Sequence, residues 1–418
     1  MNDDEPPTAT LSAAASAAPA RARAGATAPL ALMEVAARPP QVFVRGEGAW
    51  LFDADGKRYL DFVQGWAVNS LGHCPPEIAQ AVAAQAQRLV SPSPAFYNDQ
   101  AIAFAELLAH ATGMDSVFLA SSGAEANEGA IKLARKWGAV KRGGAYKIVT
   151  FNDAFHGRTL ATMSASGKAG WDQLFEPKVP GFPKATLNDL ASVERLIDER
   201  TVAVMLEPVQ GEAGVVPVSA AFLQALRALC DQRGLLLILD EVQTGVGRTG
   251  TFCAFQQFGV KPDILTLGKG IGGGVPLAAL LTTREHMVFA HGDQGGTYSG
   301  NPLMAAVGHA VVSAVLAPGF LAAVNTRAAT LQQVLGGFAQ RLGGDERGIG
   351  LLRALVLPRP LGPQLVEAAR VLAPTGLLVN APRPNLLRLM PALNVSDAEI
   401  AQMAELLEAA FAAIGEPL

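Results

Sequence analysis

An acidic residue and a lysine each end a short apolar run in this chain. Residues 235–239 are all Leu or Ile and lead into Asp240, and residues 263–268 lead into Lys269. Short apolar runs bounded by turn signals are typical of buried strands in a parallel sheet. Ligands of open α/β sheets bind outside the carboxyl ends of the strands, so we expect both charges to reach one crevice.

An amine beside a carboxylate in such a crevice is the arrangement that a pyridoxal phosphate site requires. The amine forms a Schiff base with the cofactor, and the acid keeps the pyridine nitrogen protonated so that the ring accepts electrons. The alternative is a surface Lys269 and a strand-end Asp240 with no joint role. Most Asp/Lys pairs are of that second kind, so the other motifs have to show whether Asp240 and Lys269 share a role.

Composition limits the class of protein. The 418 residues are half apolar and include 43 glycines, which favours a two-domain α/β protein with a large core. A net charge of −4 gives no electrostatic reason to expect a nucleic-acid partner. No apolar stretch is long enough to span a bilayer, so we expect no membrane partner. The cysteines and histidines lack metal-ligand spacing, which predicts reduced thiols and no metal site.

The first 29 residues are rich in Ala, Pro, Thr and Ser, with almost no large apolar side chains. We predict a disordered leader there, and its acidic start argues against a secretory signal. A transit peptide is the remaining alternative to a cytoplasmic protein. Beyond the leader, residues 30–74 and 316–418 are predicted to form a small domain, and residues 75–315 a large cofactor-binding domain.

Alternating patterns predict an α/β fold with helices on both faces of a mainly parallel sheet. Apolar strands are expected at residues 116–120, 147–151, 202–206, 235–239, 264–267 and 277–281. The small domain is expected to be α+β. Its predicted elements are a hairpin around residues 53–56, a helix at 326–342, strands at 351–357 and 386–390, and a closing helix capped by Ser396.

A helix is predicted to start directly after the first of these strands. Residues 121–128 read Ser-Ser-Gly-Ala-Glu-Ala-Asn-Glu and open an Ala-rich segment. Free backbone N–H groups and the helix dipole bind anions at such a start, and Gly123 lets backbone approach a phosphate closely. An ordinary N-cap explains the segment equally well. Its position at a strand carboxyl end, like those of Asp240 and Lys269, favours the phosphate site.

Residues 268–273 formally match the dinucleotide pattern G-x-G-x-x-G. The context does not fit that pattern, because Gly274-Val275-Pro276 follows in place of a helix and no βαβ unit surrounds it. A P-loop does not fit either, since glycine follows Lys269. A nucleotide-binding oxidoreductase is therefore the weakest alternative.

Phe155 and Arg158 follow the strand expected at residues 147–151. A phenyl ring there can stack on a planar cofactor, and a guanidinium can bind a carboxylate through two hydrogen bonds. A core position for Phe155 and a turn position for Arg158 are the alternatives.

Charged residues also follow or interrupt other apolar strands. Glu207 and Glu212 come after the strand at residues 202–206, and Arg388 lies inside the run at 386–390. Such charges are costly unless they are solvated or paired. Glu212 and Arg388 form either a structural bridge or a carboxylate receptor that the glutamate masks.

Together these segments resemble the class III (subgroup II) aminotransferases of fold type I, from about Leu30 to the C-terminus. The motifs that carry the resemblance follow the family order, at residues 65–73, 122–128, 155–159, 207–214, 240–243, 269 and 296–297. The resemblance implies a large domain with a mainly parallel, seven-stranded type of sheet and a smaller α+β domain built from both termini. It also implies a pyridoxal 5′-phosphate cofactor and a homodimer with shared active sites.

The resemblance further implies roles for the residues around the cofactor ring. Lys269 forms the Schiff base, and Asp240 binds the pyridine nitrogen. Val242 packs under the ring and Phe155 stacks on its other face. Gln243 reaches the ring hydroxyl.

It also implies which residues bind the phosphate and the substrate. Gly123-Ala124 and Thr297 of the partner subunit hold the phosphate. Arg158 and Arg388 bind substrate carboxylates. Glu212 pairs with Arg388 while the amino donor is bound and releases it for 2-oxoglutarate.

The implied reaction moves the δ-amino group of N2-acetyl-L-ornithine to 2-oxoglutarate, giving glutamate, as in arginine biosynthesis. N-succinyl-LL-2,6-diaminopimelate is implied as a second donor. Gly65 stands where ornithine-specific members have a tyrosine, which favours the acetylated donor, whereas Tyr97 resembles a pocket residue of those members. Gly296 replaces a serine that many members have. Ornithine, succinylornithine, 4-aminobutyrate, an aminomutase and a non-catalytic relative are the alternatives.

Overall fold

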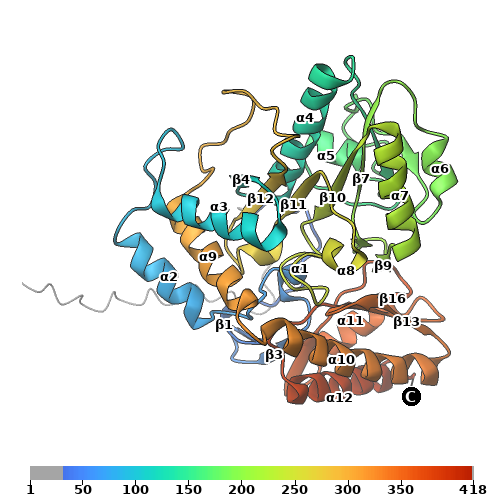
Figure 1. Ribbon diagram of the computed structural model, residues 1–418. Helices are drawn as coiled ribbons and strands as arrows, with labels where there is room; N and C mark the ends of the chain where they lie inside the picture. Colours follow the sequence, from blue (N-terminus) through green and yellow to red (C-terminus); the bar gives the residue numbers. More distant parts are fainter. Residues whose placement is uncertain (1–31, 417–418) are drawn as a thin grey trace, which may run out of the picture.

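A seven-stranded sheet forms the centre of the computed structural model, which describes residues 32–416 (Figure 1). In spatial order its strands are β4 (Ser116–Ala120), β12 (Ala278–Thr282), β11 (Ile264–Leu267), β10 (Leu236–Glu241), β7 (Thr201–Leu206), β5 (Lys147–Phe151) and β6 (Lys184–Ala185). The strands from β11 to β6 pair in parallel, whereas β12 pairs antiparallel with both of its neighbours. The predicted α/β fold with a mainly parallel sheet is confirmed.

Both faces of this sheet are packed. Alternate residues of β10 enter different clusters of buried side chains, Leu237 and Leu239 one cluster, Leu236 and Ile238 the other. Every residue of β7, β10, β11 and β12 is buried. A strand that is covered on both faces has no polar side to alternate with, which explains the continuous apolar runs. The strand predicted at residues 235–239 continues through Asp240.

Helices cover the sheet. The long helix α4 (Gly123–Lys141) packs on β4, β12, β11 and β7, and α7 (Ala220–Arg233) packs on β10. On the β4 side, α2 (Pro76–Ala86) and α3 (Asp99–Thr112) both pack on α9 (Pro302–Leu316). Short helical segments lie between the strands at α1 (Gln64–Ala67), α5 (Leu160–Ala165), α6 (Leu190–Glu194), α8 (Phe255–Phe258) and η1 (Lys269–Ile271).

Segments from both ends of the chain share a second sheet. Its order is β1 (Phe43–Glu47), β2 (Trp50–Asp53), β3 (Arg58–Asp61) and β15 (Thr375–Leu378). The antiparallel pair β2–β3 is the predicted hairpin, and β15 pairs in parallel with β3. Neither β1 nor β15 was expected. The pairing of β15 crosses more than three hundred residues of sequence, which local patterns do not contain, and the side chains of β1 are mostly exposed.

The remaining C-terminal elements form a helix and sheet layer beside it. The strands are β13 (Asp345–Ile349), β14 (Leu352–Val356) and β16 (Leu386–Leu389). The helices are α10 (Phe320–Leu342), α11 (Gly362–Val371) and α12 (Asp397–Ala413). A small pair from the middle of the chain, β8 (Val209–Gln210) and β9 (Val216–Pro217), lies near β13. Ser396 and Glu399 form the predicted capping box of α12. The domain boundaries at residues 75 and 316 stay a prediction, and the predicted leader at 1–29 lies outside the described residues.

In the described part of the chain, no single helix is long and apolar enough to cross a membrane. The helices α9 and α10 pass that test only when they are counted together, and they meet at an angle of 71°. Among residues 32–416, no group of three or more His, Cys, Asp or Glu side chains is placed to hold a metal ion.

Candidate active site

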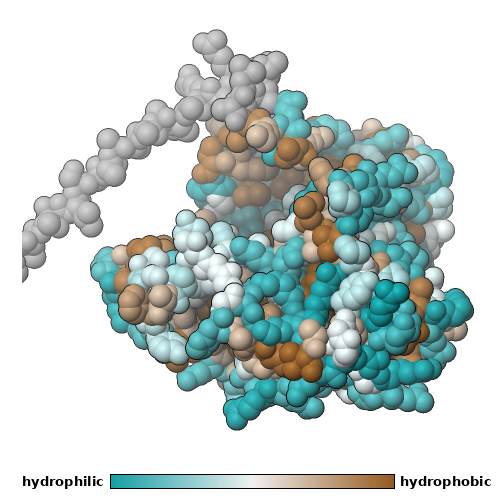
Figure 2. All heavy atoms as spheres, turned by 90° about the horizontal axis from the view of Figure 1, so that it is seen from above, coloured by the Kyte–Doolittle hydropathy of each residue, from teal (hydrophilic) through white to brown (hydrophobic). Residues whose placement is uncertain are grey.

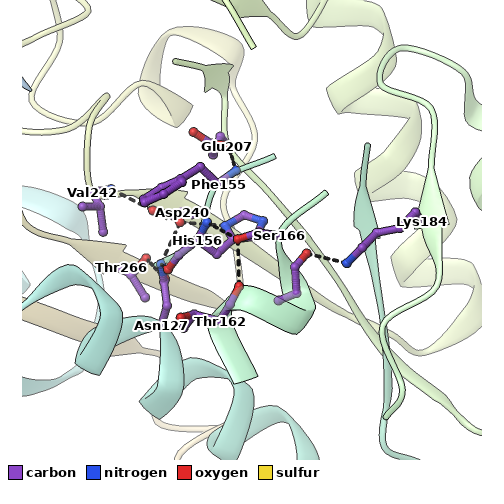
Figure 3. Close-up of polar contacts among 11 residues, drawn as sticks. Asn127, Phe155, His156, Thr162, Ser166, Lys184, Glu207, Asp240, Val242 and Thr266 are labelled. Atoms are coloured by element: carbon purple, nitrogen blue, oxygen red, sulfur yellow. Dashed lines mark hydrogen bonds and ion pairs between the residues drawn. The ribbon is translucent and has the colours of Figure 1, made fainter. Parts of the chain in front are cut away.

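Asp240 lies near the carboxyl end of β10 with its side chain buried and fully hydrogen-bonded. Its Oδ2 accepts hydrogen bonds from Asn127 Nδ2 at 2.7 Å and from His156 Nδ1 at 2.8 Å. Its Oδ1 accepts from the backbone N–H of Val242 at 3.0 Å. Figure 3 shows these donors converging on the carboxylate. Hydrogen bonds to the charged form stabilise an ionised carboxylate in a buried site.

The donors to Asp240 are held in place by a further layer of contacts. Thr266 on β11 is the register partner of Asp240 and donates to Asn127 Oδ1 at 2.7 Å. Asn127 also donates to the backbone carbonyl of His156 at 2.8 Å, and the His156 N–H donates to Ser166 Oγ at 2.8 Å. This network was not predicted from the sequence. Asn127 and His156 both lie inside predicted motifs, at residues 121–128 and 155–159, but neither residue was given a role there.

Lys269 follows the neighbouring strand β11 and reaches the same edge of the sheet. Burial lowers the pKa of its amine, as does the nearby charge of Arg388, while Asp240, Glu207 and Glu212 act in the opposite direction. Its backbone has a positive φ of 44°, a region that a lysine rarely adopts. The structure therefore brings the amine and the carboxylate of the two sequence-predicted residues into one charged cluster. An amine with a lowered pKa is a better nucleophile near neutral pH.

Glu207 is a second buried carboxyl in this cluster. Its Oε1 accepts the backbone N–H of Phe155 at 2.9 Å, and its side chain is drawn above Asp240 in Figure 3. Burial raises the pKa of Glu207 to about 8, and the charge of Asp240 adds to that shift. Two carboxyls in one apolar site do not both ionise easily, so the raised pKa keeps Glu207 mainly protonated at neutral pH.

The N-terminus of α4 lies against Val242, two residues after Asp240. A Cβ on Gly123 would lie 2.7 Å from Val242 Cγ1, and one on Gly268 would lie 3.0 Å from the same atom. Glycine at both positions therefore lets two backbone segments approach Val242. Ala124 packs beside Gly157, where an added Cβ would lie 2.9 Å from the Ala124 Cβ. The helix start also carries the predicted N-cap, a capping box between Ser122 and Glu125.

Arg388 on β16 is fully buried and faces the cluster from the small sheet. Its Nη2 donates to Glu212 Oε1 at 2.9 Å and its Nε to Asn380 Oδ1 at 2.8 Å. Its Nη1 is buried without a hydrogen-bond partner among the described residues. A Cβ on Gly211 would lie 1.8 Å from Gln243 Oε1 and 3.3 Å from that Nη1, so these two side chains meet over Gly211.

The Glu212–Arg388 pair is asymmetric in its exposure. The Glu212 side chain is 30% exposed and that of Arg388 is 0% exposed. Burial lowers the pKa of Arg388, and Glu212 opposes that shift. For Glu212 burial acts to raise the pKa, but the charges of Arg388 and Lys168 outweigh it and the pKa is lowered. The pair is therefore a stable ion pair with one free guanidinium donor, which suits a masked receptor for a carboxylate.

Trp171 joins the aromatic and cationic residues of the segment after β5. Its ring lies 5.5 Å from that of Phe155, centre to centre, and 5.3 Å from the guanidinium carbon of Arg158. Arg158 is exposed and Phe155 is half-buried. Trp171 was not predicted as a site residue, because it stands in a loop without a recognisable motif.

Three predicted site residues are not part of this buried cluster within one chain. Tyr97, Gly296 and Thr297 are exposed, Tyr97 at 94%. Tyr97 and Gly296 line a separate cavity of about 440 Å³ with Phe118 and Gln294, and no member of the Lys269 cluster lines it.

A buried lysine beside a hydrogen-bonded aspartate at the carboxyl edge of this sheet defines a pyridoxal-phosphate-dependent enzyme of fold type I. The chain belongs to the class III aminotransferases, because residues 33–411 match the family model described as aminotransferase class-III. The predicted family, fold type, enzyme class and cofactor are confirmed.

Two relatives within this family are named acetylornithine aminotransferases and are similar to this chain over most of its length. Acetylornithine aminotransferase 2 of Bordetella bronchiseptica is 64% identical over 385 residues, which cover 92% of this chain and 97% of that protein. Acetylornithine aminotransferase of Ralstonia nicotianae is 60% identical over 389 residues, covering 92% and 98%.

Solved structures of aminotransferases also resemble this chain. N-acetylornithine aminotransferase from Stenotrophomonas maltophilia has 36% identity and a TM-score of 0.77, covering 90% of this chain and 96% of its own. Ornithine aminotransferase from Toxoplasma gondii has 31% identity and a TM-score of 0.87, covering 92% and 93%.

Proposed function

We propose that this chain transfers the δ-amino group of N2-acetyl-L-ornithine to 2-oxoglutarate, forming N-acetylglutamate 5-semialdehyde and glutamate in arginine biosynthesis. The observation that carries the proposal is the name of the relatives at 60–64% identity, over 92% of this chain. The related structure named for ornithine is only 31% identical. N-succinyl-LL-2,6-diaminopimelate is a proposed second donor, and the cytoplasm is the proposed location.

The cofactor, when bound, supplies an electron sink that stabilises negative charge on the substrate carbon. Lys269 is assigned as the residue that binds it covalently and then moves a proton as general base and acid, for which a lowered amine pKa is suited. Asp240 is assigned to the ring nitrogen, because its three hydrogen-bond donors keep it charged in a buried site.

The surrounding residues are assigned to hold the ring and the phosphate. Val242 and Phe155 are both drawn near the Asp240 carboxylate in Figure 3, and they are assigned to the two faces of the flat ring. Gln243 is assigned to the ring hydroxyl. Gly123-Ala124, at the N-terminus of α4, is assigned to the phosphate, where the helix dipole favours negative charge.

Substrate carboxylates are assigned to Arg158 and Arg388. Arg158 is exposed and takes the carboxylate of the donor. Arg388 is masked by Glu212 at 2.9 Å and takes the second carboxylate that only the acceptor carries. Discrimination between the two half-reactions then follows from which carboxylate occupies Arg388.

The active unit is proposed to be a homodimer in which Thr297 of the partner subunit completes the phosphate site, with Gly296 and Tyr97 nearby. Large apolar side chains are exposed around these residues, at Phe96 (69%), Tyr97 (94%) and Tyr298 (68%). Separate apolar patches stand out against a hydrophilic surface in the view of Figure 2. Exposed aromatic groups of this size favour burial against another subunit.

A donor panel tests the proposed substrate. With 2-oxoglutarate as acceptor, kcat/KM is expected to be highest for N2-acetylornithine, followed by N-succinyl-diaminopimelate, and lower for ornithine, succinylornithine and 4-aminobutyrate. Gly65 is exposed and has a φ of 61°, and by the family resemblance it stands where ornithine-specific members have a tyrosine. A preference for free ornithine would overturn the proposal, and an uncoloured, inactive protein would favour the non-catalytic alternative.

A further inference from the structure

We propose that Lys168 is a positioning residue for the acceptor half of the reaction, as the cation to which Glu212 moves when 2-oxoglutarate occupies Arg388. This inference rests on the proposed function and adds a residue that the predicted motifs do not contain. Lys168 lies in the segment between α5 and β6, three residues before Trp171.

The Glu212 carboxylate lies between two cations. Its Oε1 is 2.9 Å from Arg388 Nη2, and its Oε2 is 3.7 Å from Lys168 Nζ. The side chain of Lys168 is 37% exposed, whereas that of Arg388 is 0% exposed. A movement of Glu212 from Arg388 toward Lys168 therefore carries the carboxylate from the buried side of the site toward solvent, along a path with a cation at each end.

Trp171 holds the Lys168 amine near that path. The Lys168 Nζ lies 5.5 Å from the centre of the Trp171 ring, and the Arg158 guanidinium carbon lies 5.3 Å from the same centre. Cations over an aromatic face are attracted by the ring quadrupole. The indole thus contacts both Lys168 and the proposed carboxylate receptor Arg158, and it packs beside Phe155.

The need for a second cation follows from charge. When an acceptor carboxylate binds Arg388, Glu212 loses its counterion, and a partly buried carboxylate without a partner is costly. Two carboxylates on one guanidinium also repel each other. Lys168 compensates for both effects by pairing with the displaced Glu212. Lys269 also faces Glu212, but in the acceptor half-reaction its amine is assigned to proton transfer, which a lasting ion pair with Glu212 would oppose.

This arrangement makes the role of Lys168 specific to one substrate. N2-acetylornithine has a single carboxylate, which is assigned to Arg158, so Glu212 stays on Arg388 while the donor reacts. 2-Oxoglutarate has two carboxylates and has to displace Glu212. Loss of the Lys168 charge is therefore expected to weaken acceptor binding and to leave donor binding unchanged.

The test compares holoenzyme variants Lys168→Met and Lys168→Arg with a control, Lys141→Met, which removes an exposed charge at the far end of α4. Lys168→Met is expected to raise the KM for 2-oxoglutarate roughly fivefold to tenfold, the range for a half-buried charge pair. The Kd of glutarate, a dicarboxylate that cannot react, should rise in parallel by calorimetry. The KM for N2-acetylornithine should stay within about twofold, Lys168→Arg should restore the acceptor values, and Lys141→Met should change neither.

A double-mutant cycle separates this role from direct binding of the acceptor. In a Glu212→Gln background no displaced charge needs a partner, so Lys168→Met is expected to have no further effect on the glutarate Kd. If the loss persists in that background, Lys168 binds the acceptor itself and the inference is wrong. Equal KM changes for donor and acceptor would also overturn it. If the wild-type protein does not use N2-acetylornithine, the proposed donor fails independently, and the glutarate cycle still reports on Lys168.

Discussion

The Nδ1 atom of His156 lies 2.8 Å from Oδ2 of Asp240, and both side chains are buried. An ionised carboxylate only accepts hydrogen bonds, so Nδ1 is the protonated nitrogen of the imidazole. The other nitrogen, Nε2, is buried without a partner among the described residues. His156 Nδ1 therefore donates to Asp240, and this hydrogen bond favours the charged form of the carboxylate.

Replacement of Asp240 by asparagine tests the importance of its charge. The amide keeps the volume and one acceptor but removes the negative charge, so kcat is expected to fall about a thousandfold. Steady-state turnover measures this loss, and circular dichroism checks that the fold is unchanged. Activity within tenfold of wild type would remove the assigned role of Asp240.

Lys269→Ala is expected to abolish turnover, because no other buried amine among the described residues shares the cluster with Asp240 and Glu207. The variant should also lose the visible absorbance of the covalently bound cofactor, which spectroscopy of the purified protein detects. The asparagine variant at Asp240 is a useful control, since it should retain covalent binding. A Lys269→Ala protein with intact turnover would contradict the assignment.

Glu207→Gln tests the raised pKa of Glu207. At pH 7 a carboxyl with a pKa of about 8 is mainly protonated, and glutamine can still accept the Phe155 N–H, so activity is expected to stay within about twofold. Above pH 8 the wild-type carboxyl ionises and raises the pKa of Lys269, which keeps the amine protonated. The glutamine of the variant stays uncharged and does not raise the pKa of Lys269. The ratio of kcat/KM, variant over wild type, should therefore rise above pH 8, and a ratio that is flat from pH 6.5 to 9.5 would show that Glu207 does not titrate in this range.

Glu212→Ala removes the residue that masks Arg388. Dicarboxylates then reach the guanidinium without displacing a counterion, so the KM for 2-oxoglutarate is expected to fall several-fold. Glutamate, which carries the same two carboxylates, should become a better amino donor relative to N2-acetylornithine. Competition between the two donors measures this ratio. An unchanged ratio would mean that Glu212 only has a structural role.

Two glycines in helices give a stability prediction with a matched control. In α4, a Cβ on Gly138 would lie 1.9 Å from the carbonyl oxygen of Ala145, so Gly138→Ala is expected to lower the free energy of unfolding by about 2 kcal/mol or more. In α10, a Cβ on Gly337 meets nothing within 4 Å. Gly337→Ala is therefore expected to raise the free energy of unfolding by about 0.5–1 kcal/mol. Chemical denaturation measures both changes, and equal shifts would contradict the close approach of α4 to the backbone at Ala145.

The strands of the central sheet were predictable because they are buried on both faces. Their apolar runs are continuous, and each ends in a turn or a charged residue. The two-residue strand β6 has no such run, and β15 is defined by its pairing with β3 rather than by its own pattern. Residues in these segments are placed by distant partners, which a local pattern does not contain.

The residues of the candidate site also fall into two groups, those that the sequence predicted and those that only tertiary packing places. Asp240 and Lys269 were predicted from the apolar runs that they follow in the sequence, whereas Asn127 and His156 were recognised only as parts of motifs. Their hydrogen bonds to one carboxylate depend on the packing of α4 and of the segment after β5 on the same edge of the sheet. Neither distance in sequence nor residue type predicts that meeting.

The sequence by itself determined the sheet, the order of the motifs and the residue types that the chemistry uses, because hydrophobic periodicity and turn residues act locally. Only the tertiary structure decided which charges face one another. Glu212 and Arg388 are separated by 176 residues and lie 2.9 Å apart, and Lys168 approaches the same carboxylate from a loop with no motif. Charge pairing in a low-dielectric site depends on distance in space, and that distance exists only after both ends of the chain have packed against the sheet.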